Sequence, residues 1–244
     1  MFLKRLSEIL VSTLYPDICA GCNDIIPEGE YFCDCCYAML DRCETDKFCL
    51  KCGILKKNCL CNSRVYHFDY CISPLYNSGV ARRAMYKFKF RKKRYISEFF
   101  AKQMALCVKQ CYDGVCFDGA VYVPIEKAKA FKRGYNQGQV LAEEISDILG
   151  IPVLYDALLS KGKKHTQHEL KNVEERYENV KDVYYSEKNL GGKTLLLVDD
   201  IRTSGATLDA CAKALLAAGA DRVYCITGLM TDKKSKLKGK KNGN

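Results

Sequence analysis

The sequence lacks any long apolar run. No uninterrupted apolar stretch of the 244 residues approaches the roughly 18–20 that a helix needs to cross a bilayer. The first fifteen residues also lack the small-residue cleavage site of a signal peptide, and Glu8 interrupts their short apolar run. We therefore predict a cytoplasmic protein without a membrane span, in which residues 1–18 form an amphipathic helix that packs on the body.

The cysteine pattern does not indicate a disulfide framework, although the chain has sixteen cysteines. Ten of them lie between Cys19 and Cys61, mostly in C-x-x-C pairs, and the other six are scattered singly through apolar or helical sequence. Clustered pairs are typical of metal thiolates in a reducing compartment. The scattered cysteines are expected to be small apolar side chains in the core.

The clustered cysteines have the spacing of zinc ligands. Two C-x-x-C turns complete a closed tetrahedral site, whereas a catalytic zinc keeps an open position and commonly has His or carboxylate ligands. The pattern predicts structural zinc that staples a segment too small to fold alone, with direct recognition as the alternative. Because the last pair is C-x-C, the number and pairing of the sites stay open. The predicted ligands are Cys19, Cys22, Cys33, Cys36, Cys49, Cys52, Cys59 and Cys61.

Positive charge is concentrated in two stretches. The formal net charge is +10, yet residues 82–94 contain eight basic residues and no acidic one, and residues 232–244 contain six lysines and one aspartate. Localised charge favours a polyanionic partner over a general effect on solubility. The tail, residues 231–244, has almost nothing to bury and is expected to be disordered.

Strand and helix patterns alternate between residues 63 and 230. Buried strands are predicted over 119–125, 151–155, 193–200 and 222–228, and helices over 136–149 and 206–218. Asn136 is the expected helix cap and Gly150 the helix terminator. This order predicts an α/β fold with a mostly parallel sheet flanked by helices. The predicted units are 1–62, a helix and zinc-ribbon module, 63–230, the α/β domain, and 231–244, the basic tail.

Residues 195–207, LLLVDDIRTSGAT, combine features that a ribose-phosphate group requires. A buried strand delivers two carboxylates at its carboxyl end, where open α/β sheets bind ligands. The hydroxyl-rich loop that follows opens into a helix, whose free N–H groups suit a phosphate. The carboxylates would accept hydrogen bonds from ribose hydroxyls and orient a hydrated divalent metal. The predicted ligand-binding residues are Asp199, Asp200, Arg202, Thr203, Ser204, Gly205, Ala206 and Thr207.

Two other interpretations of this segment compete. The strand also fits the acidic strand of an ATPase, but the chain lacks a phosphate-binding P-loop to accompany it. Residues 191–194 resemble the end of a P-loop, yet Glu187 stands where glycine is required, and the motif precedes a strand instead of following one. The other alternative, an ordinary strand-to-helix turn with capping residues, stays open.

Residues 195–207 resemble the phosphoribosyl-diphosphate (PRPP) signature of type I phosphoribosyltransferases. From Tyr15 to Met230 the chain resembles the ComF family, which combines a zinc ribbon with a phosphoribosyltransferase-like domain. The resemblance also depends on Val123-Pro124, on residues 133–137 and on Thr166-Gln167, Glu175-Arg176 and Asn179. It departs at residues 202–204, where the commoner pattern has two threonines before glycine. Serine keeps the second hydroxyl.

The resemblance implies PRPP or a nucleotide-like ligand bound with Mg²⁺, and a role in natural competence, in which incoming single-stranded DNA is handled with a helicase partner. Lys127 and Arg133 are then expected on the pyrophosphate side, and residues 161–176 where related enzymes carry a mobile loop. If the protein transfers a phosphoribosyl group, the sequence does not identify the acceptor. The alternative is a non-catalytic DNA-processing adaptor that senses a nucleotide or binds a nucleic-acid 5′-phosphate.

The basic stretch has two interpretations of its own. Aromatic residues between the cations offer stacking faces beside phosphate contacts, which suits single-stranded DNA. In the alternative the helix is solvated and Met85, Phe88 and Phe99 form an inward stripe. The DNA-binding candidates are Arg82, Arg83, Lys87, Lys89, Arg91, Lys92, Lys93 and Arg94, with Tyr86, Phe88, Phe90 and Tyr95 between and beside them.

Overall fold

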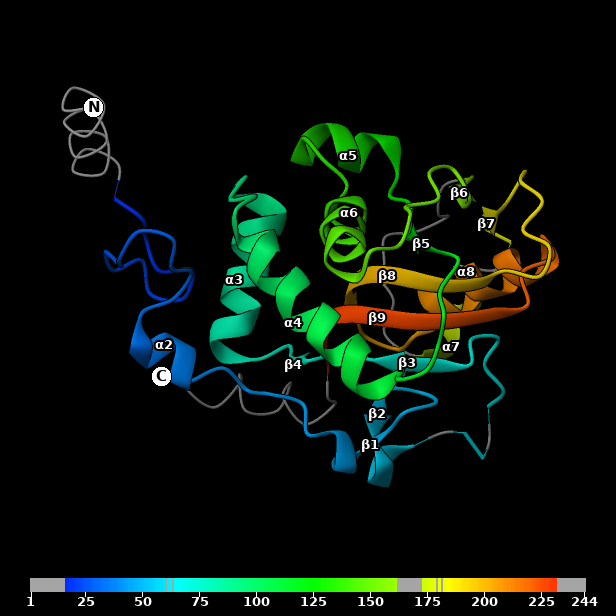
Figure 1. The fold of residues 1–244 in the computed structure, drawn as a ribbon, viewed down its shortest axis with the longest axis horizontal. Helices are drawn as coiled ribbons and strands as arrows, with labels where there is room; N and C mark the ends of the chain where they lie inside the picture. The colour runs from blue at the N-terminus through cyan, green and yellow to red at the C-terminus, as the bar shows by residue number, and fades with distance from the viewer. Residues whose placement is uncertain are drawn as a thin grey trace.

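The computed structural model describes residues 16–59, 61–62, 64–161, 173–178, 180 and 182–231. Its centre is a parallel sheet (Figure 1) of β3 (Tyr70–Ile72), β4 (Leu75–Tyr76), β5 (Gly119–Tyr122), β8 (Thr194–Arg202) and β9 (Arg222–Met230). The strand order is β3-β9-β8-β5, and β4 pairs with β9 beyond β3. Every one of these pairings is parallel, so the predicted mostly parallel sheet is confirmed.

Helices cover both faces of the sheet (Figure 1). On one face lie α3 (Gly79–Phe90), α4 (Ile96–Cys111) and α6 (Gln137–Leu149). On the other lie α8 (Ala206–Ala217) and the short α7 (Val173–Glu178). Residues 195–198 are fully buried, and their side chains alternate between the two clusters. A continuous apolar run of this kind is typical of a parallel strand covered on both faces.

Local signals fix the ends of the helices around the site. The Asn136 side chain caps α6 by accepting hydrogen bonds from the N–H groups of Gly138 and Gln139, and Gly150 follows α6 in the left-handed conformation. The short helix α5 (Lys127–Arg133) ends at a left-handed Gly134. The predicted strand 151–155 is reduced to a single bridge between Val153 and Ala120, beside Pro152, which cannot donate to a ladder.

The cysteine-rich segment contains little regular structure: α2 (Asp34–Ala38), the 3₁₀ turns η1 (Thr45–Lys47) and η2 (Lys56–Asn58), and a two-stranded ladder of β1 (Phe48–Cys49) and β2 (Ile54–Leu55). Cys19 and Cys36 belong to the same apolar cluster as α3, whereas Cys52 belongs to the cluster on the opposite face. The two halves of this segment thus join different faces of the core. The division into 1–62, 63–230 and 231–244 stays a prediction.

A second short antiparallel ladder pairs β6 (Leu159–Ser160) with β7 (Tyr184–Tyr185). The predictions for residues 1–15 and 232–244 fall outside the described residues, as do those for 162–172, for Asn179 and for the side chain of Arg176. Within the described part of the chain, no helix combines the length and apolar character needed to span a membrane.

Candidate ribose-phosphate site and cationic groove

The loop from β8 to α8 closes tightly around Gly205. This residue adopts φ 86° immediately before α8, and a Cβ there would lie 3.2 Å from Nη2 of Arg202. The left-handed backbone therefore favours glycine, and a larger residue would also displace the Arg202 guanidinium by a few tenths of an ångström. The N–H of Ala206 donates to Oγ of Ser204 at 3.3 Å. Small and hydroxyl residues thus line the opening of α8, as the sequence predicts.

The two carboxylates have different surroundings. Asp199 is partly exposed and accepts a hydrogen bond from the N–H of Asp200 at 2.8 Å. Asp200 is buried and pairs with Lys89 of α3, with 2.6 Å between Nζ and Oδ2. Only 15% of the Lys89 side chain and 12% of the Asp200 side chain are exposed. Lys89 is thus engaged with the carboxylate site, although the sequence groups it with the DNA-binding candidates.

Arg202 lies beneath the loop instead of beside it. Its exposed fraction is 1%, and none of its guanidinium nitrogens has a hydrogen-bond partner among the described residues. The Cys225 thiol, and after it the Arg202 guanidinium, lower the pKa of Cys71 against the opposing effect of burial. Arg202 therefore lies against Gly205 and next to the core cysteine Cys71.

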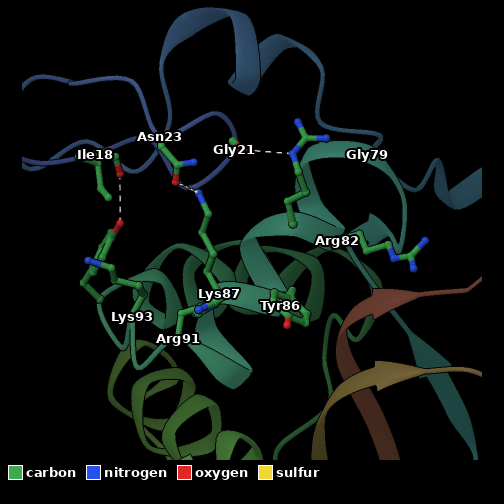
Figure 2. A pocket seen from close by; sticks show the side chains of 11 residues that line it. Ile18, Gly21, Asn23, Gly79, Arg82, Tyr86, Lys87, Arg91 and Lys93 are labelled. Atoms are coloured by element: carbon green, nitrogen blue, oxygen red, sulfur yellow. Dashed lines mark hydrogen bonds between the residues drawn. The ribbon is translucent and has the colours of Figure 1, made fainter. Parts of the chain in front are cut away.

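Five cations line a cavity of about 940 Å³ between α3 and the first half of the cysteine-rich segment (Figure 2). No acidic side chain is among its lining residues. We call this cavity the cationic groove. The cations are Arg82, Arg83, Lys87, Arg91 and Lys93, and the other walls come from Ile18, Gly21, Asn23, Gly79, Tyr86 and Tyr95.

Hydrogen bonds from this helical region hold the cysteine-rich wall in place (Figure 2). Nζ of Lys87 donates to Oδ1 of Asn23 at 2.6 Å and to the carbonyl of Cys19 at 3.2 Å. Nε of Arg83 donates to the carbonyl of Gly21 at 3.0 Å. Burial lowers the pKa of Lys87. The groove is therefore a fixed feature of the packing between two segments.

The aromatic residues of the basic stretch divide between the two predicted roles. Phe88 is fully buried, which confirms an inward stripe with Met85 and Phe99. Tyr86 and Phe90 remain about half exposed, and their ring centroids lie 5.0 Å apart. The Arg133 guanidinium lies 4.8 Å from the Phe90 ring, and Arg133 also donates to Gln137 at 2.6 Å. The side chain of Lys127 lies outside the described residues.

The cysteines form two tetrads with the geometry of closed metal sites. The first comprises Cys19, Cys22, Cys33 and Cys36, the second Cys49, Cys52, Cys59 and Cys61, and the sulfur atoms of each lie within 4.8 Å of one another. The close sulfur pairs are 3.6–3.8 Å apart. A tetrahedron with Zn–S bonds of 2.3 Å has edges of about 3.8 Å. Both tetrads could therefore hold a metal such as zinc.

Backbone groups support the thiolate form of Cys19 in the first tetrad. The N–H groups of Gly21 and Cys33 each point at Sγ of Cys19 from 3.3 Å. Burial acts to raise the pKa of Cys19, but N–H groups of Cys22, Cys33 and Gly21 outweigh it and bring the pKa to about 6. A thiolate stabilised in this way is ready to bind a cation.

Comparison with known proteins finds a matching domain family and several similar proteins. The family described as phosphoribosyl transferase domain matches residues 136–243. Competence protein F of Haemophilus influenzae is 26% identical over 84% of this chain and 87% of that protein. DNA utilization protein YhgH of Escherichia coli is 31% identical over 45% of this chain and 48% of that protein. A solved adenine phosphoribosyltransferase is similar at 18% identity, with a TM-score of 0.41, over 63% of this chain and 80% of its own.

The sheet and the matched domain define a protein with the type I phosphoribosyltransferase fold, preceded by a cysteine module. The similarity to Competence protein F and to Competence protein ComFC covers 84% of this chain, which is more than the matched domain alone. Similarity to two competence proteins over 84% of the chain, together with the matched domain, supports the ComF family.

Proposed function

We propose that this protein acts in competence by binding PRPP, or a related ribose-phosphate ligand, at residues 199–207, and single-stranded DNA along the cationic groove. One observation supports the proposed ligand site. Asp199 and Asp200, near the end of β8, lie next to a hydroxyl-rich loop that leads into α8 through the left-handed Gly205. The names of its relatives, a competence protein and a DNA utilization protein, support the cellular role.

Each part of the ligand has a matching chemical group. The N–H groups at the start of α8 would bind the 5-phosphate, helped by the helix dipole and by the hydroxyls of Thr203, Ser204 and Thr207. Asp199 and Asp200 would accept hydrogen bonds from the ribose hydroxyls. These oxygen donors also suit Mg²⁺, which would neutralise the diphosphate when bound.

Two activities could use this site. In phosphoribosyl transfer, an acceptor displaces diphosphate from C1 of the ribose, and the protein contributes orientation and electrostatic stabilisation more than covalent chemistry. In a non-catalytic adaptor, the same ligand is bound and sensed. Pyrophosphate release from Mg·PRPP, measured with nucleobases and with single-stranded DNA as acceptors, separates the two.

The cationic groove supports the proposal for DNA. Five cations without an acid attract a phosphate backbone, and the exposed Tyr86 and Phe90 rings next to them offer faces on which bases can stack. We also propose that each cysteine tetrad holds one structural zinc ion, and that the first tetrad keeps the wall of the groove folded.

Replacing both carboxylates tests the ligand site. The variant Asp199→Asn with Asp200→Asn should bind Mg·PRPP roughly a hundredfold or more weakly, because each lost charge-assisted hydrogen bond is worth about 1.5–3 kcal/mol. Calorimetry measures the affinity. The exposed Asp147→Asn of α6 is the matched control and should bind as the wild type does. Equal affinity in the double variant and the wild type would exclude ribose binding by this pair.

A further inference from the structure

Lys89 differs from the other cations of α3 in the direction of its side chain. Lys87, two positions earlier, points to the cysteine-rich wall, where it binds Asn23 (Figure 2) and also the carbonyl of Cys19. Two positions correspond to about 200° around a helix, so Lys89 lies on the opposite side. There it meets Asp200 at 2.6 Å. The basic stretch thus supplies one of its charges to the ligand site.

The ion pair between Lys89 and Asp200 is buried, so each charge depends on the other. Both side chains are more than four-fifths buried, and a buried charge of this kind is strongly unfavourable without its partner. Consecutive side chains of a strand point to opposite faces, and Asp200 is the carboxylate on the face of α3. On that face the protein itself provides the cation that balances Asp200.

We propose that Lys89 is a positioning residue of the ligand site, whose ammonium takes the place of a divalent cation as the counter-charge of Asp200. This inference rests on the proposed ribose-phosphate site. The ammonium contacts Oδ2, so Oδ1 would be the acceptor for a ribose hydroxyl. Recognition of the ribose then needs no metal, and the need for Mg²⁺ is confined to the diphosphate of PRPP.

Ribose 5-phosphate is the suitable probe, because it has the sugar and the 5-phosphate but no diphosphate. Wild-type protein should bind it with the same affinity in EDTA and in saturating Mg²⁺, as measured by calorimetry. Lys89→Met should weaken binding in EDTA on the order of tenfold or more, because Asp200 loses its counter-charge. Mg²⁺ should restore most of that loss by replacing the ammonium.

Three further variants complete the test. Lys89→Arg keeps the charge and should bind ribose 5-phosphate in EDTA as the wild type does. Lys109→Met removes an exposed cation of α4 and should leave this binding unchanged. Lys89→Gln keeps a polar side chain without its charge; it should behave like Lys89→Met and replaces that variant if thermal unfolding shows that Met prevents folding.

The possible results separate the two proposals. A Lys89→Met protein that binds normally in EDTA, or whose loss is the same with and without Mg²⁺, would refute the counter-charge role while leaving the ligand site intact. Wild-type protein that binds neither ribose 5-phosphate nor Mg·PRPP would overturn the proposed function and this inference with it. The counter-charge role is supported if Mg²⁺ restores ribose 5-phosphate binding to Lys89→Met and if Lys89→Arg binds equally well with and without Mg²⁺.

Discussion

The two cysteine tetrads have nearly the same internal geometry but different neighbours. The first is bound through its backbone carbonyls to Arg83 and Lys87, so it forms a wall of the cationic groove. The second is bound to the sheet edge, where the N–H of Cys71 in β3 donates to the carbonyl of Leu50 at 2.8 Å. The two tetrads thus contact different parts of the molecule. We expect the first to affect binding and the second to affect the stability of the sheet.

Removing ligands from each tetrad should separate these roles, and this is the largest effect that we expect. Cys49→Ser with Cys61→Ser should destabilise the fold by more than about 4 kcal/mol, because a structural zinc contributes directly to folding. Cys22→Ser with Cys33→Ser should cost less stability but weaken binding of single-stranded DNA at least about tenfold.

Each double variant should lose one of two zinc ions, as counted by elemental analysis, and denaturant unfolding gives the stability. Cys35→Ser changes an exposed cysteine outside both tetrads and should retain both ions. Equal losses of stability and of DNA affinity in the two double variants would mean that the tetrads do not differ in role.

Charge removal from the groove should have an intermediate effect. In the variant with Arg82, Arg91 and Lys93 changed to Ala, the slope of log affinity against log salt for single-stranded DNA should fall by up to about 2, since each phosphate contact contributes about 0.7. The control changes the exposed Lys57, Lys109 and Lys213 to Ala, which removes the same charge elsewhere.

The lysine-rich tail needs a separate control, because it can attract DNA by itself. A truncation before Asp232 should lower the affinity less than the groove variant does. If only truncation weakens binding and the groove variant keeps the wild-type slope, the folded domain is not the DNA site.

A single glycine should give the smallest effect. Gly53 has φ +64°, and a Cβ there would lie 2.5 Å from the carbonyl oxygen of Cys71. Gly53→Ala should therefore lower the free energy of unfolding by more than the about 1–2 kcal/mol that a left-handed backbone alone costs. Gly29 also has a positive φ but nothing within 4 Å, so Gly29→Ala isolates the backbone cost. Equal destabilisation by the two variants would show that β3 moves to accommodate the added Cβ, so that the close contact adds no cost to that of the backbone.

The sequence is sufficient to predict elements whose signals are local. The buried run ending in two aspartates, the cap at Asn136 and the terminator at Gly150 predict β8 and α6 close to their observed positions. The parallel α/β fold follows from the alternation of such elements, and the cysteine spacing predicts ligands that do assemble into tetrads.

Contacts between distant segments could not be predicted in this way. Nothing in the local pattern distinguishes Lys89, which pairs with Asp200, from Lys87, which binds the cysteine-rich wall. Strand alternation would also place Arg202 on the same side as Asp200. Instead Ile201 packs on the cluster that contains α3, while Arg202 turns to the core cysteines of the opposite cluster. The alternation of side chains between the two faces of β8 is interrupted after Asp200, and only the tertiary structure shows this.

Helix α3 contributes side chains to both proposed binding sites, through Lys89 on one side and Lys87 on the other. If a ligand at the end of β8 displaces this helix and so changes the affinity for DNA by some factor, thermodynamic linkage requires DNA to change the affinity for that ligand by the same factor. Bound ribose-phosphate ligand would then change the affinity for DNA, and bound DNA would change the affinity for that ligand, through one helix of twelve residues.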